Sequence, residues 1–446
     1  MDAIVEARNQ EEHRNFVSNL VDAKHEIEAF VAGRLGWPRA GRYGGFRKGS
    51  FNVGFVIENV DSGCKALIRF PVPGRTYMPW RAEKVTNEAM VLDYLREHTT
   101  IPVPRVLSWG LEEESPRRLG PFLILEYVHG TCLDDLLKQP TKDQHEPSIL
   151  DPSIDEAKLD GVYDQIASYI VQLSRLEFPR IGAIGEGGVV LKRPLTYDMN
   201  DLVTTTGYPA DRLLSEPVES VESYFHSVSK MLWTNLETQR NAVSSERDAR
   251  RRFTARRCFP QLIPKYSIAN DGPFVLFVDD FRPANMLADP ETLKMTAVLD
   301  FEFTNAMPAQ FAWDVPGWLL LQAPAAWLER DERDKFLELF VPRMEQFLRA
   351  VERAETESPA VEGQRLSARM RESWDTGRFW FNSAIRSSLD IDTIYWSVFH
   401  DREVGIDKGC LEGIDEFADA KMKQLDAYVE EEKKKMDCQD ESGKID

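Results

Sequence analysis

Cysteine is scarce in this sequence, and its few copies form no recognisable motif. The 446 residues include 5 Cys, scattered at positions 64, 132, 258, 410 and 438 without a Cys-x-x-Cys pair. Closely paired cysteines are the usual signature of zinc sites, and regular sets of them indicate disulfide scaffolds. The scattered pattern argues against both kinds of protein and fits a reducing compartment, so we expect a cytoplasmic protein.

Long hydrophobic runs are absent as well. The longest apolar stretch, residues 315–328, is interrupted by two prolines and a glutamine. A membrane-spanning helix needs about 20 apolar residues in succession. The N-terminal residues MDAIVEAR are charged and lack the apolar core of a signal peptide. We therefore expect no membrane partner.

Positive charge is in the minority. The chain has 55 Lys and Arg against 74 Asp and Glu, which gives a net charge of −19. Because proteins that bind nucleic-acid backbones present basic surfaces, no nucleic-acid partner is expected. An acidic surface suits a cationic small substrate and suits plain solubility equally well. Hydrophobic residues make up 42% of the chain, which is typical of a folded globular protein.

Strand-like segments are concentrated in the first third of the chain. They are short, rich in β-branched and aromatic residues and bounded by turn formers, and they lie at 50–57, 64–70, 106–109 and 122–128. Asp61-Ser-Gly63 is a hairpin signal between the first two, and Gly44-Gly45 is a further candidate turn. Helical spacing of apolar residues appears at 10–35 and 81–97.

Helical spacing dominates from residue 130 onward. A long apolar stripe runs from 159 to 176, and a helical stretch at about 218–255 lies within a polar insert. We predict an α+β fold with two lobes and a cleft between them. Its parts are an N-terminal helical extension at 1–40, a small β-rich N-lobe at 41–128, a larger helical C-lobe at 129–435 with an insert at 180–270, and a polar, frayed tail at 436–446.

The most informative segment is residues 277–302. It places Asp280, Asn285 five residues later and Asp300 a further fifteen along, each beside an apolar, strand-like run. Phosphoryl transfer needs a carboxylate that orients the attacking hydroxyl, together with an amide and a second carboxylate that hold Mg²⁺. These three residues can fill the roles in that order. The alternative is that Asp-x-x-x-x-Asn arises by chance and that the carboxylates only form turns.

A short glycine-containing loop, Gly49-Ser-Phe-Asn-Val-Gly54, opens the β-rich region. Backbone without a Cβ can approach phosphate oxygens closely, and successive N–H groups form an anion-binding concavity. We therefore expect Gly49, Ser50 and Asn52 to contact nucleotide phosphates. No Gly-Lys-Ser/Thr follows, so the loop is no Walker A motif, and an ordinary hairpin is the alternative.

Arg69 ends the apolar run Ala66-Leu-Ile-Arg69. A cation that points inward from such a strand must find an anion, because arginine does not deprotonate. Glu88 on the following helix is the candidate. A strand cation that pairs with a helix carboxylate and reaches the phosphates is the arrangement found in kinases. The alternative is an edge-strand arginine that faces water.

Two more segments complete the candidate site. Glu126 opens the crossing between the predicted lobes, where backbone groups can hydrogen-bond an adenine edge while Val128 packs beside it. An edge residue without a ligand is the alternative there. Arg282 follows Asp280 by two residues, and a fixed cation at that place can neutralise charge on a transferring phosphoryl group.

Taken together, these motifs resemble the superfamily of aminoglycoside phosphotransferases and choline kinases, which are protein-kinase-like small-molecule kinases. Within it, the likeness is to the fungal branch of the phosphotransferase enzyme family, and it runs from about Gly45 to Trp318. The matching strings are Asp280-Phe-Arg-Pro-Ala-Asn-Met-Leu-Ala-Asp289, Ala297-Val-Leu-Asp-Phe-Glu-Phe303, Ile101-Pro-Val-Pro104, Gly120-Pro-Phe-Leu-Ile-Leu-Glu-Tyr-Val-His-Gly130 and Arg193-Pro-Leu-Thr196.

The resemblance implies a bilobal protein-kinase-like fold, ATP as phosphoryl donor and Mg²⁺ as cofactor. It carries Asp280 over as catalytic base and Asn285 and Asp300 as metal ligands, while Arg69 and Glu88 fall where the family has its strand lysine and helix glutamate. The predicted function is ATP-dependent transfer of phosphate to a hydroxyl of a small molecule, amine-bearing acceptors included.

Three departures from the family pattern favour an alternative function. Val278 stands where the family usually has a histidine two residues before the catalytic aspartate. Arg69 replaces the family's strand lysine, and the glycine loop contains few glycines. The alternative is therefore a catalytically degenerate pseudokinase that acts as a binding or scaffold module. A protein Ser/Thr kinase is disfavoured, because the segment after Asp300 reaches the next helix too soon for an activation segment.

Overall fold

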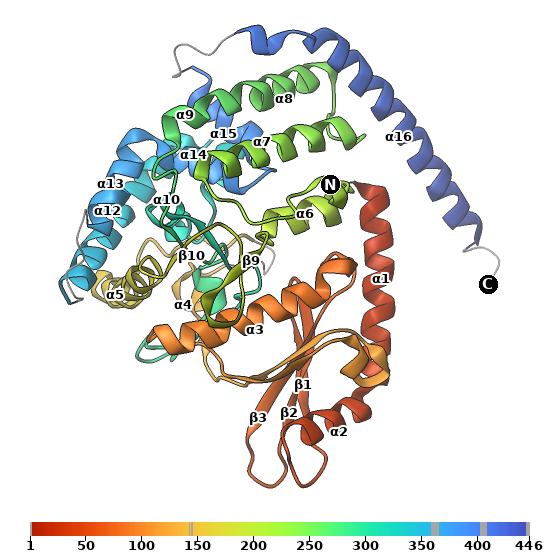
Figure 1. Cartoon of the computed structure of the whole chain (residues 1–446), viewed down its shortest axis with the longest axis vertical. Helices are drawn as coiled ribbons and strands as arrows, with labels where there is room; N and C mark the ends of the chain where they lie inside the picture. The colour runs from red at the N-terminus through yellow and green to blue at the C-terminus, as the bar shows by residue number, and fades with distance from the viewer. Residues whose placement is uncertain (1, 142, 144–145, 358–364, 402–407, 443–446) are drawn as a thin grey trace.

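The structure is a computed structural model that describes residues 2–141, 143, 146–357, 365–401 and 408–442, with the side chains of 408 and 435–442 excepted. A small lobe built on an antiparallel sheet lies at one end, and a larger, mostly helical lobe forms the rest (Figure 1). The predicted α+β, protein-kinase-like fold class is confirmed.

The small lobe has a five-stranded antiparallel sheet in the order β1-β2-β3-β5-β4. Its strands are β1 (Arg42–Lys48), β2 (Asn52–Glu58), β3 (Lys65–Pro71), β4 (Val106–Gly110) and β5 (Phe122–Glu126). Helix α3 (Arg81–His98) connects β3 to β4. Strands β2 and β5 are buried along most of their length and β3 is buried at alternate residues, whereas the edge strand β1 is largely exposed.

Two N-terminal helices, α1 (Ala3–Asp22) and α2 (Lys24–Arg34), pack on this sheet. The single helix predicted at 10–35 is divided at Ala23, which is fully buried. Side chains of the two helices share one apolar core with the strands, and the core includes Phe16, Leu20, Ile27, Val31, Val53, Phe55 and Ile68. The N-terminal segment is thus a cover of the small lobe. Helix α1 also reaches the large lobe, where Asn9 donates to the Thr204 carbonyl at 2.5 Å.

The turn predicted at Gly44-Gly45 is wrong, because both glycines lie inside β1. The register of β1 against β2 shifts between Tyr43 and Gly45, and Gly45 has φ +141°. A Cβ at Gly44 would lie 3.3 Å from the Val56 carbonyl oxygen. The two glycines therefore permit a β-bulge rather than a reversal. The chain reverses instead between Lys48 and Asn52, in the glycine loop.

The large lobe is mainly helical, and its helices are drawn from residue 133 onward in Figure 1. They are α4 (Leu133–Leu137), α5 (Glu156–Leu173), α6 (Tyr197–Thr206), α7 (Val221–Thr238), α8 (Glu246–Cys258), α9 (Ile263–Tyr266), α10 (Ala309–Ala312), α11 (Pro324–Glu329), α12 (Arg333–Glu357), α13 (Leu366–Thr376), α14 (Arg378–Arg386), α15 (Ile391–Ile394) and α16 (Ile414–Ser442).

Two helical predictions need correction. The stretch predicted at 218–255 is two helices, α7 and α8, and the Ser245 hydroxyl accepts from the Asp248 N–H to begin the second. The polar tail predicted to fray from 436 continues helix α16 as far as Ser442. Residues 443–446 of that tail lie outside the described part of the chain.

Short strands in the large lobe position two loops that matter below. β10 (Phe274–Phe277) pairs with β13 (Asn305–Pro308) and β7 (Glu177–Phe178), and β11 (Met286–Ala288) pairs with β12 (Met295–Val298) and β6 (Thr131–Cys132). A two-stranded sheet joins β8 (Ala183–Ile184) to β9 (Val190–Lys192). Residues 278–285 therefore connect β10 to β11, and residues 299–304 connect β12 to β13.

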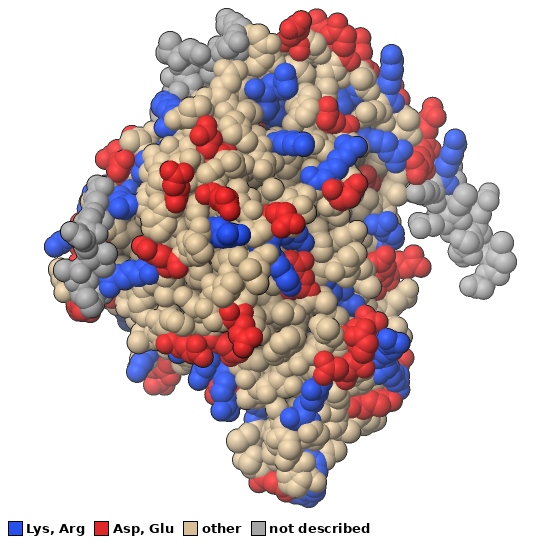
Figure 2. All heavy atoms as spheres, in the orientation of Figure 1, with Lys and Arg blue, Asp and Glu red and all other residues tan. Residues whose placement is uncertain are grey.

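The negative charge is not gathered into one patch on the face drawn in Figure 2, where acidic and basic side chains are interspersed. Many of them form exposed ion pairs, such as Arg353 with Asp164 at 2.6 Å. Among the described helices, none combines the length and the apolar character that crossing a membrane requires.

A buried carboxyl in helix α6 gives a prediction for stability. Asp198 is 7% exposed and accepts hydrogen bonds from the Ser388 N–H at 2.7 Å and hydroxyl at 2.6 Å. Burial raises the pKa of Asp198 to about 7. An unfolded aspartate titrates near pH 4. The native state therefore binds more protons between these values, so the stability contributed by this group is lost as the pH rises from about 4 to 7.

We expect Asp198→Asn to flatten this dependence, because asparagine can keep both contacts and does not titrate. The difference between the two proteins should approach about 1.4 kcal/mol per pH unit across the window. Urea unfolding at pH 5, 6, 7 and 8 measures it. Parallel curves for the two proteins would contradict the assignment.

Candidate active site

A cavity of about 430 Å³ lies between the sheet of the small lobe and the loops at β11 and β12. Its volume is in the range of small-molecule sites. The sequence prediction named seven nucleotide-contacting and two metal-binding residues, and all of them line this cavity: Gly49, Ser50, Asn52, Arg69, Glu88, Glu126, Val128, Asn285 and Asp300. Segments that are far apart in the sequence thus meet at one place.

Arg69 and Glu88 form an ion pair at the back of the cavity. Arg69 lies on β3, which is central in the sheet, so the alternative of an edge-strand arginine is wrong. The two side chains are only 14% and 4% exposed. Burial lowers the pKa of Arg69, but the carboxylates of Glu88, Glu302 and Asp300 outweigh it and raise the pKa above its ordinary value. Arg69 therefore stays a fixed cation.

Glu88 also links helix α3 to the segment that follows β12. Its carboxylate oxygen Oε1 accepts from the Phe301 N–H at 3.2 Å, beside Asp300. One carboxylate thus positions both the strand cation and the backbone that carries the predicted metal ligand.

The loop between β10 and β11 places Asp280, Arg282 and Asn285 in mutual contact. The Asn285 amide nitrogen donates to the Asp280 carboxylate at 2.8 Å and to its carbonyl at 3.0 Å. The Arg282 Nε lies 2.5 Å from the other Asp280 oxygen. Asp280 is 39% exposed on its side chain. Arg282 contacts Asp280 and does not line the 430 Å³ cavity.

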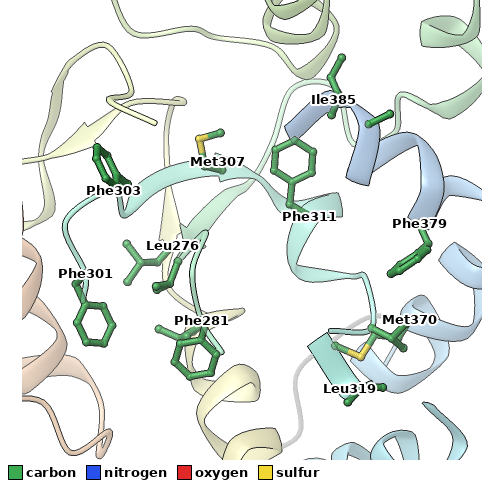
Figure 3. Packing of buried hydrophobic residues seen from close by; sticks show 14 of the residues in the cluster. Leu276, Phe281, Phe301, Phe303, Met307, Phe311, Leu319, Met370, Phe379 and Ile385 are labelled. Atoms are coloured by element: carbon green, nitrogen blue, oxygen red, sulfur yellow. The ribbon is translucent and has the colours of Figure 1, made fainter. Parts of the chain in front are cut away.

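Buried apolar side chains anchor the loops 278–285 and 299–304 in the core of the large lobe. Phe281 and Phe301 are 9% and 1% exposed, and Figure 3 shows them with Leu276 in the cluster that underlies both loops. Val278, at the position of the family histidine, is 6% exposed and belongs to the same cluster. The Leu299 N–H donates to the Asn285 carbonyl at 2.8 Å, and this backbone bond joins the two loops directly.

Asp300 has the environment of a cation ligand. Its φ of +67° turns the chain after β12, and its Oδ1 atom is buried without a hydrogen-bond partner in the described chain. Burial and the neighbouring Glu302 raise the pKa of Asp300 well above its usual range. A buried carboxylate oxygen without a donor is costly unless a cation or proton meets it.

The residues present fit Mg²⁺. The Asn285 side chain uses its N–H₂ group on Asp280, which leaves its amide oxygen for a cation beside Asp300. Among the described residues no group of three or more His, Cys, Asp and Glu could hold a metal ion. Mg²⁺ typically takes only one or two protein carboxylates, together with substrate phosphates and water.

A second, water-sized cavity separates the two loops. It is lined by Asp280 from one loop and Asp300 from the other, and Tyr197 at the start of α6 closes one side. Asp279 also lines this space. Burial raises the pKa of Asp279 to about 6. A hydroxyl that enters from this side would meet the Asp280 carboxylate.

Sequence reasoning missed one buried group of this site, Lys84. Its ammonium group is 1% exposed and pairs with Glu302, which is 3% exposed and lies two residues after Asp300. Lys84 lies one helical turn before Glu88, and residues four apart share a helix face. That spacing was a usable signal, because Glu88 had already been assigned to the site.

The match to a family model extends over most of the chain. The model described as the phosphotransferase enzyme family matches residues 50–350. Altered inheritance of mitochondria protein 9, mitochondrial, of Clavispora lusitaniae is 30% identical over 118 residues, which cover 24% of this chain and 17% of that protein.

Two solved structures show similarity at low identity. A candidate aminoglycoside phosphotransferase of Ralstonia eutropha is 16% identical with a TM-score of 0.45, covering 92% of this chain and 98% of that one. Ethanolamine kinase of Plasmodium vivax is 11% identical with a TM-score of 0.41, covering 87% and 82%. Because the family model spans more than half of the sequence, the chain belongs to the phosphotransferase enzyme family.

Proposed function

We propose that the protein is a small-molecule kinase that transfers the γ-phosphate of ATP to a hydroxyl of a metabolite. The observation that supports this most is the convergence of the glycine loop, Arg69, Asn285 and Asp300 on one cavity of nucleotide-compatible volume. Asp280 lines the smaller neighbouring cavity, where an acceptor hydroxyl would meet its carboxylate.

Each residue has a role that its position supports. Asp280 orients the acceptor hydroxyl and takes its proton, held in place by Asn285 and Arg282. Asn285 and Asp300 would hold Mg²⁺, which neutralises phosphate charge. Arg69, kept charged by Glu88, stabilises the phosphates from the back of the cavity.

The nucleotide base would lie against the linker between the lobes. Glu126 and Val128 both line the cavity there, with Leu125 and Leu67 as apolar neighbours. Backbone groups of such a linker can pair with an adenine edge, and the apolar side chains cover its faces. This arrangement supports ATP as the donor.

The acceptor would approach from the side of helix α6. Tyr197 and Asp279 line the space beside Asp280, so an aromatic ring and an extra carboxylate face an incoming molecule. This pairing suits an acceptor that carries an amine as well as a hydroxyl.

We propose a cytoplasmic location on the ground of the scattered cysteines.

Binding of Mg·ATP tests the proposal against the pseudokinase alternative. At 100 times its dissociation constant, a nucleotide should stabilise the protein by about 2.7 kcal/mol. We therefore expect a higher melting temperature with millimolar Mg·ATP, a smaller shift with ATP and EDTA, and a smaller shift for Asp300→Asn. No shift of the wild-type protein would favour a module that does not bind nucleotide.

A further inference from the structure

The glycine loop is fastened to the large lobe by a buried ammonium group. The Lys84 Nζ donates to the Asn52 side-chain oxygen at 3.0 Å, and it also pairs with Glu302. Asn52 in turn donates its amide N–H to the same Glu302 carboxylate at 2.5 Å. Helix α3, the glycine loop and the segment after Asp300 thus close one ring of contacts, which we call the Lys84 latch (Lys84, Asn52 and Glu302).

A second contact fastens the same loop. The Phe51 ring packs edge-on against Tyr197 at 5.5 Å and against Phe303 at 5.3 Å between ring centroids. Both partners belong to the large lobe. The Lys84 Nζ lies 5.8 Å from the Phe51 ring and 5.6 Å from the Phe303 ring. The polar latch and the aromatic contact are therefore neighbours, and together they hold the glycine loop against the large lobe.

The burial of Lys84 calls for an explanation. A lysine at 1% exposure loses its hydration, and a buried ion pair seldom stabilises a protein more than apolar residues of the same size would. Lys84 does not line the 430 Å³ cavity, so it contacts no ligand there. Its two partners lie at different cavities: Asn52 lines the 430 Å³ cavity, and Glu302 lines the smaller one beside Asp280.

The closed loop leaves room for a ligand. With Asn52 bound to Lys84 and Glu302, the cavity still has a volume of about 430 Å³. Gly49, Ser50 and Arg69 still line it. A loop that blocked the site would leave no such space. The latched conformation is thus a preorganised one, and fixing a binding loop in advance reduces the ordering that ligand binding must supply.

We propose that Lys84 is a positioning residue that preorganises the phosphate-binding loop of the kinase by latching Asn52 to Glu302. The inference rests on the proposed function, since it names what this ring does for nucleotide binding. Loss of Lys84 frees the loop and weakens nucleotide binding, although Lys84 touches neither substrate nor metal.

Hydrogen exchange of the ligand-free protein tests the latch first. In Lys84→Met we expect the amides of residues 49–54 to exchange about tenfold faster than in the wild type. Because that variant leaves the buried Glu302 without its ion-pair partner Lys84, it is also expected to melt at a lower temperature. Asn52→Ala is the second variant, since it opens the latch and keeps the Lys84–Glu302 pair. It should loosen the same loop with little change in melting temperature.

Arg193→Met is the matched control. Arg193 pairs at 3.0 Å with Glu83, the residue before Lys84 on helix α3. Arg193 is also buried, at 9% exposure, but it does not contact the glycine loop. Loop exchange should stay near the wild-type rate in this control. Wild-type exchange at 49–54 in both Lys84→Met and Asn52→Ala would overturn the latch.

Nucleotide affinity is the second readout. By calorimetry with Mg·ADP, both latch variants should bind about tenfold more weakly, and Arg193→Met should bind as the wild type does. A loosened loop with unchanged affinity would overturn preorganisation. Wild-type protein that binds no nucleotide would instead overturn the proposed function, and the exchange experiment would still decide whether the latch exists.

Discussion

Asp280→Asn is expected to lower ATP-dependent phosphorylation of an acceptor by about 10²–10⁴-fold, the usual contribution of a positioned general base. The amide keeps the size of the side chain and can still accept from Asn285, but it cannot take a proton. Nucleotide affinity should change little, because Asp280 does not line the 430 Å³ cavity. ADP release with a panel of amino alcohols and aminoglycosides as acceptors measures the effect.

Asp289→Asn provides the matched control for this substitution. Asp289 lies nine residues on, and its Oδ1 atom accepts from the N–H groups of Glu291 and Thr292. Asparagine retains that oxygen, so turnover should stay near the wild-type value. Equal turnover in wild type and Asp280→Asn would remove Asp280 from the mechanism.

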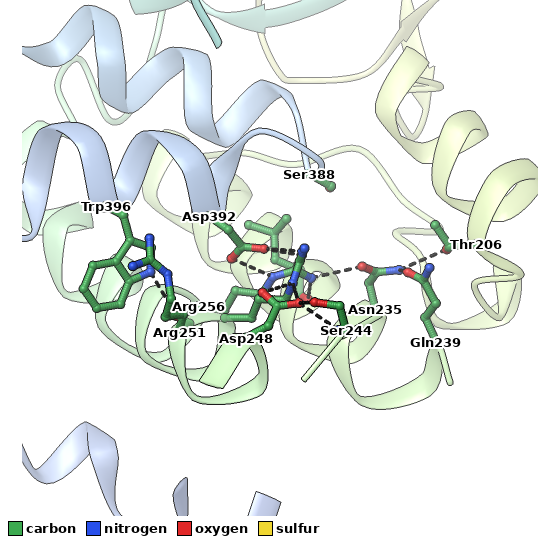
Figure 4. Close-up of polar contacts among 12 residues, drawn as sticks. Thr206, Asn235, Gln239, Ser244, Asp248, Arg251, Arg256, Ser388, Asp392 and Trp396 are labelled. Carbon is green, nitrogen blue, oxygen red and sulfur yellow. Dashed lines mark hydrogen bonds and ion pairs between the residues drawn. The ribbon is translucent and has the colours of Figure 1, made fainter. Parts of the chain in front are cut away.

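Arg256→Met is expected to destabilise the protein by about 3–5 kcal/mol, the range found when one partner of a buried ion pair is removed. Arg256 on α8 is 4% exposed and donates through Nε and Nη2 to both oxygens of Asp392, at 3.2 and 2.9 Å (Figure 4). Its third nitrogen donates to the Leu232 carbonyl at 2.8 Å and to the Asn235 side chain at 3.0 Å.

The loss should be this large because the four acceptors of Arg256 lie in the interior of the large lobe. Arg252 still donates to Asp392 at 3.0 Å and sets the lower end of the range. Arg251→Met on the same helix is the control: its guanidinium is exposed over the Trp396 ring at 4.5 Å. Such contacts are worth about 0.5–1 kcal/mol. Urea unfolding measures both variants. An equal loss of unfolding free energy in Arg256→Met and Arg251→Met would contradict the prediction.

The elements with a clear apolar period were predictable from the sequence. Helix α3, strands β2 and β3 and helix α5 lie within a few residues of their predicted bounds. Arg69 was assigned to the site from the conflict between a charged side chain and the apolar run beside it, and Asp300 from its spacing to Asp280 and Asn285. Such conflicts point to function because an isolated buried charge is costly.

The misread elements depended on contacts that local pattern does not contain. Gly44 and Gly45 read as a turn, but the facing strand β2 makes them a bulge. The helix predicted at 218–255 is interrupted at residues 239–245, where helix α7 has ended and Ser245 caps the new helix α8.

Lys84 shows the same limit at the site. A lysine within a helix is by default assigned to the solvent-facing side, since lysines are almost never fully buried unless paired. Its partner Glu302 lies 218 residues away along the chain, and no local pattern reports a pairing at that distance. Arg282, by contrast, was assigned from its proximity to Asp280 along the chain, and its side chain contacts that carboxylate.

The position of the metal ion tests the central claim most directly. Crystals grown with a non-hydrolysable ATP analogue and Mn²⁺ would reveal the ion by its anomalous signal. We predict one peak between the Asn285 amide oxygen and an Asp300 carboxylate oxygen, at the distance of about 2.1 Å at which such small divalent ions bind oxygen, with the analogue under residues 49–54. A metal bound elsewhere, or Asn285 and Asp300 without any shared ion in the nucleotide complex, would contradict the account.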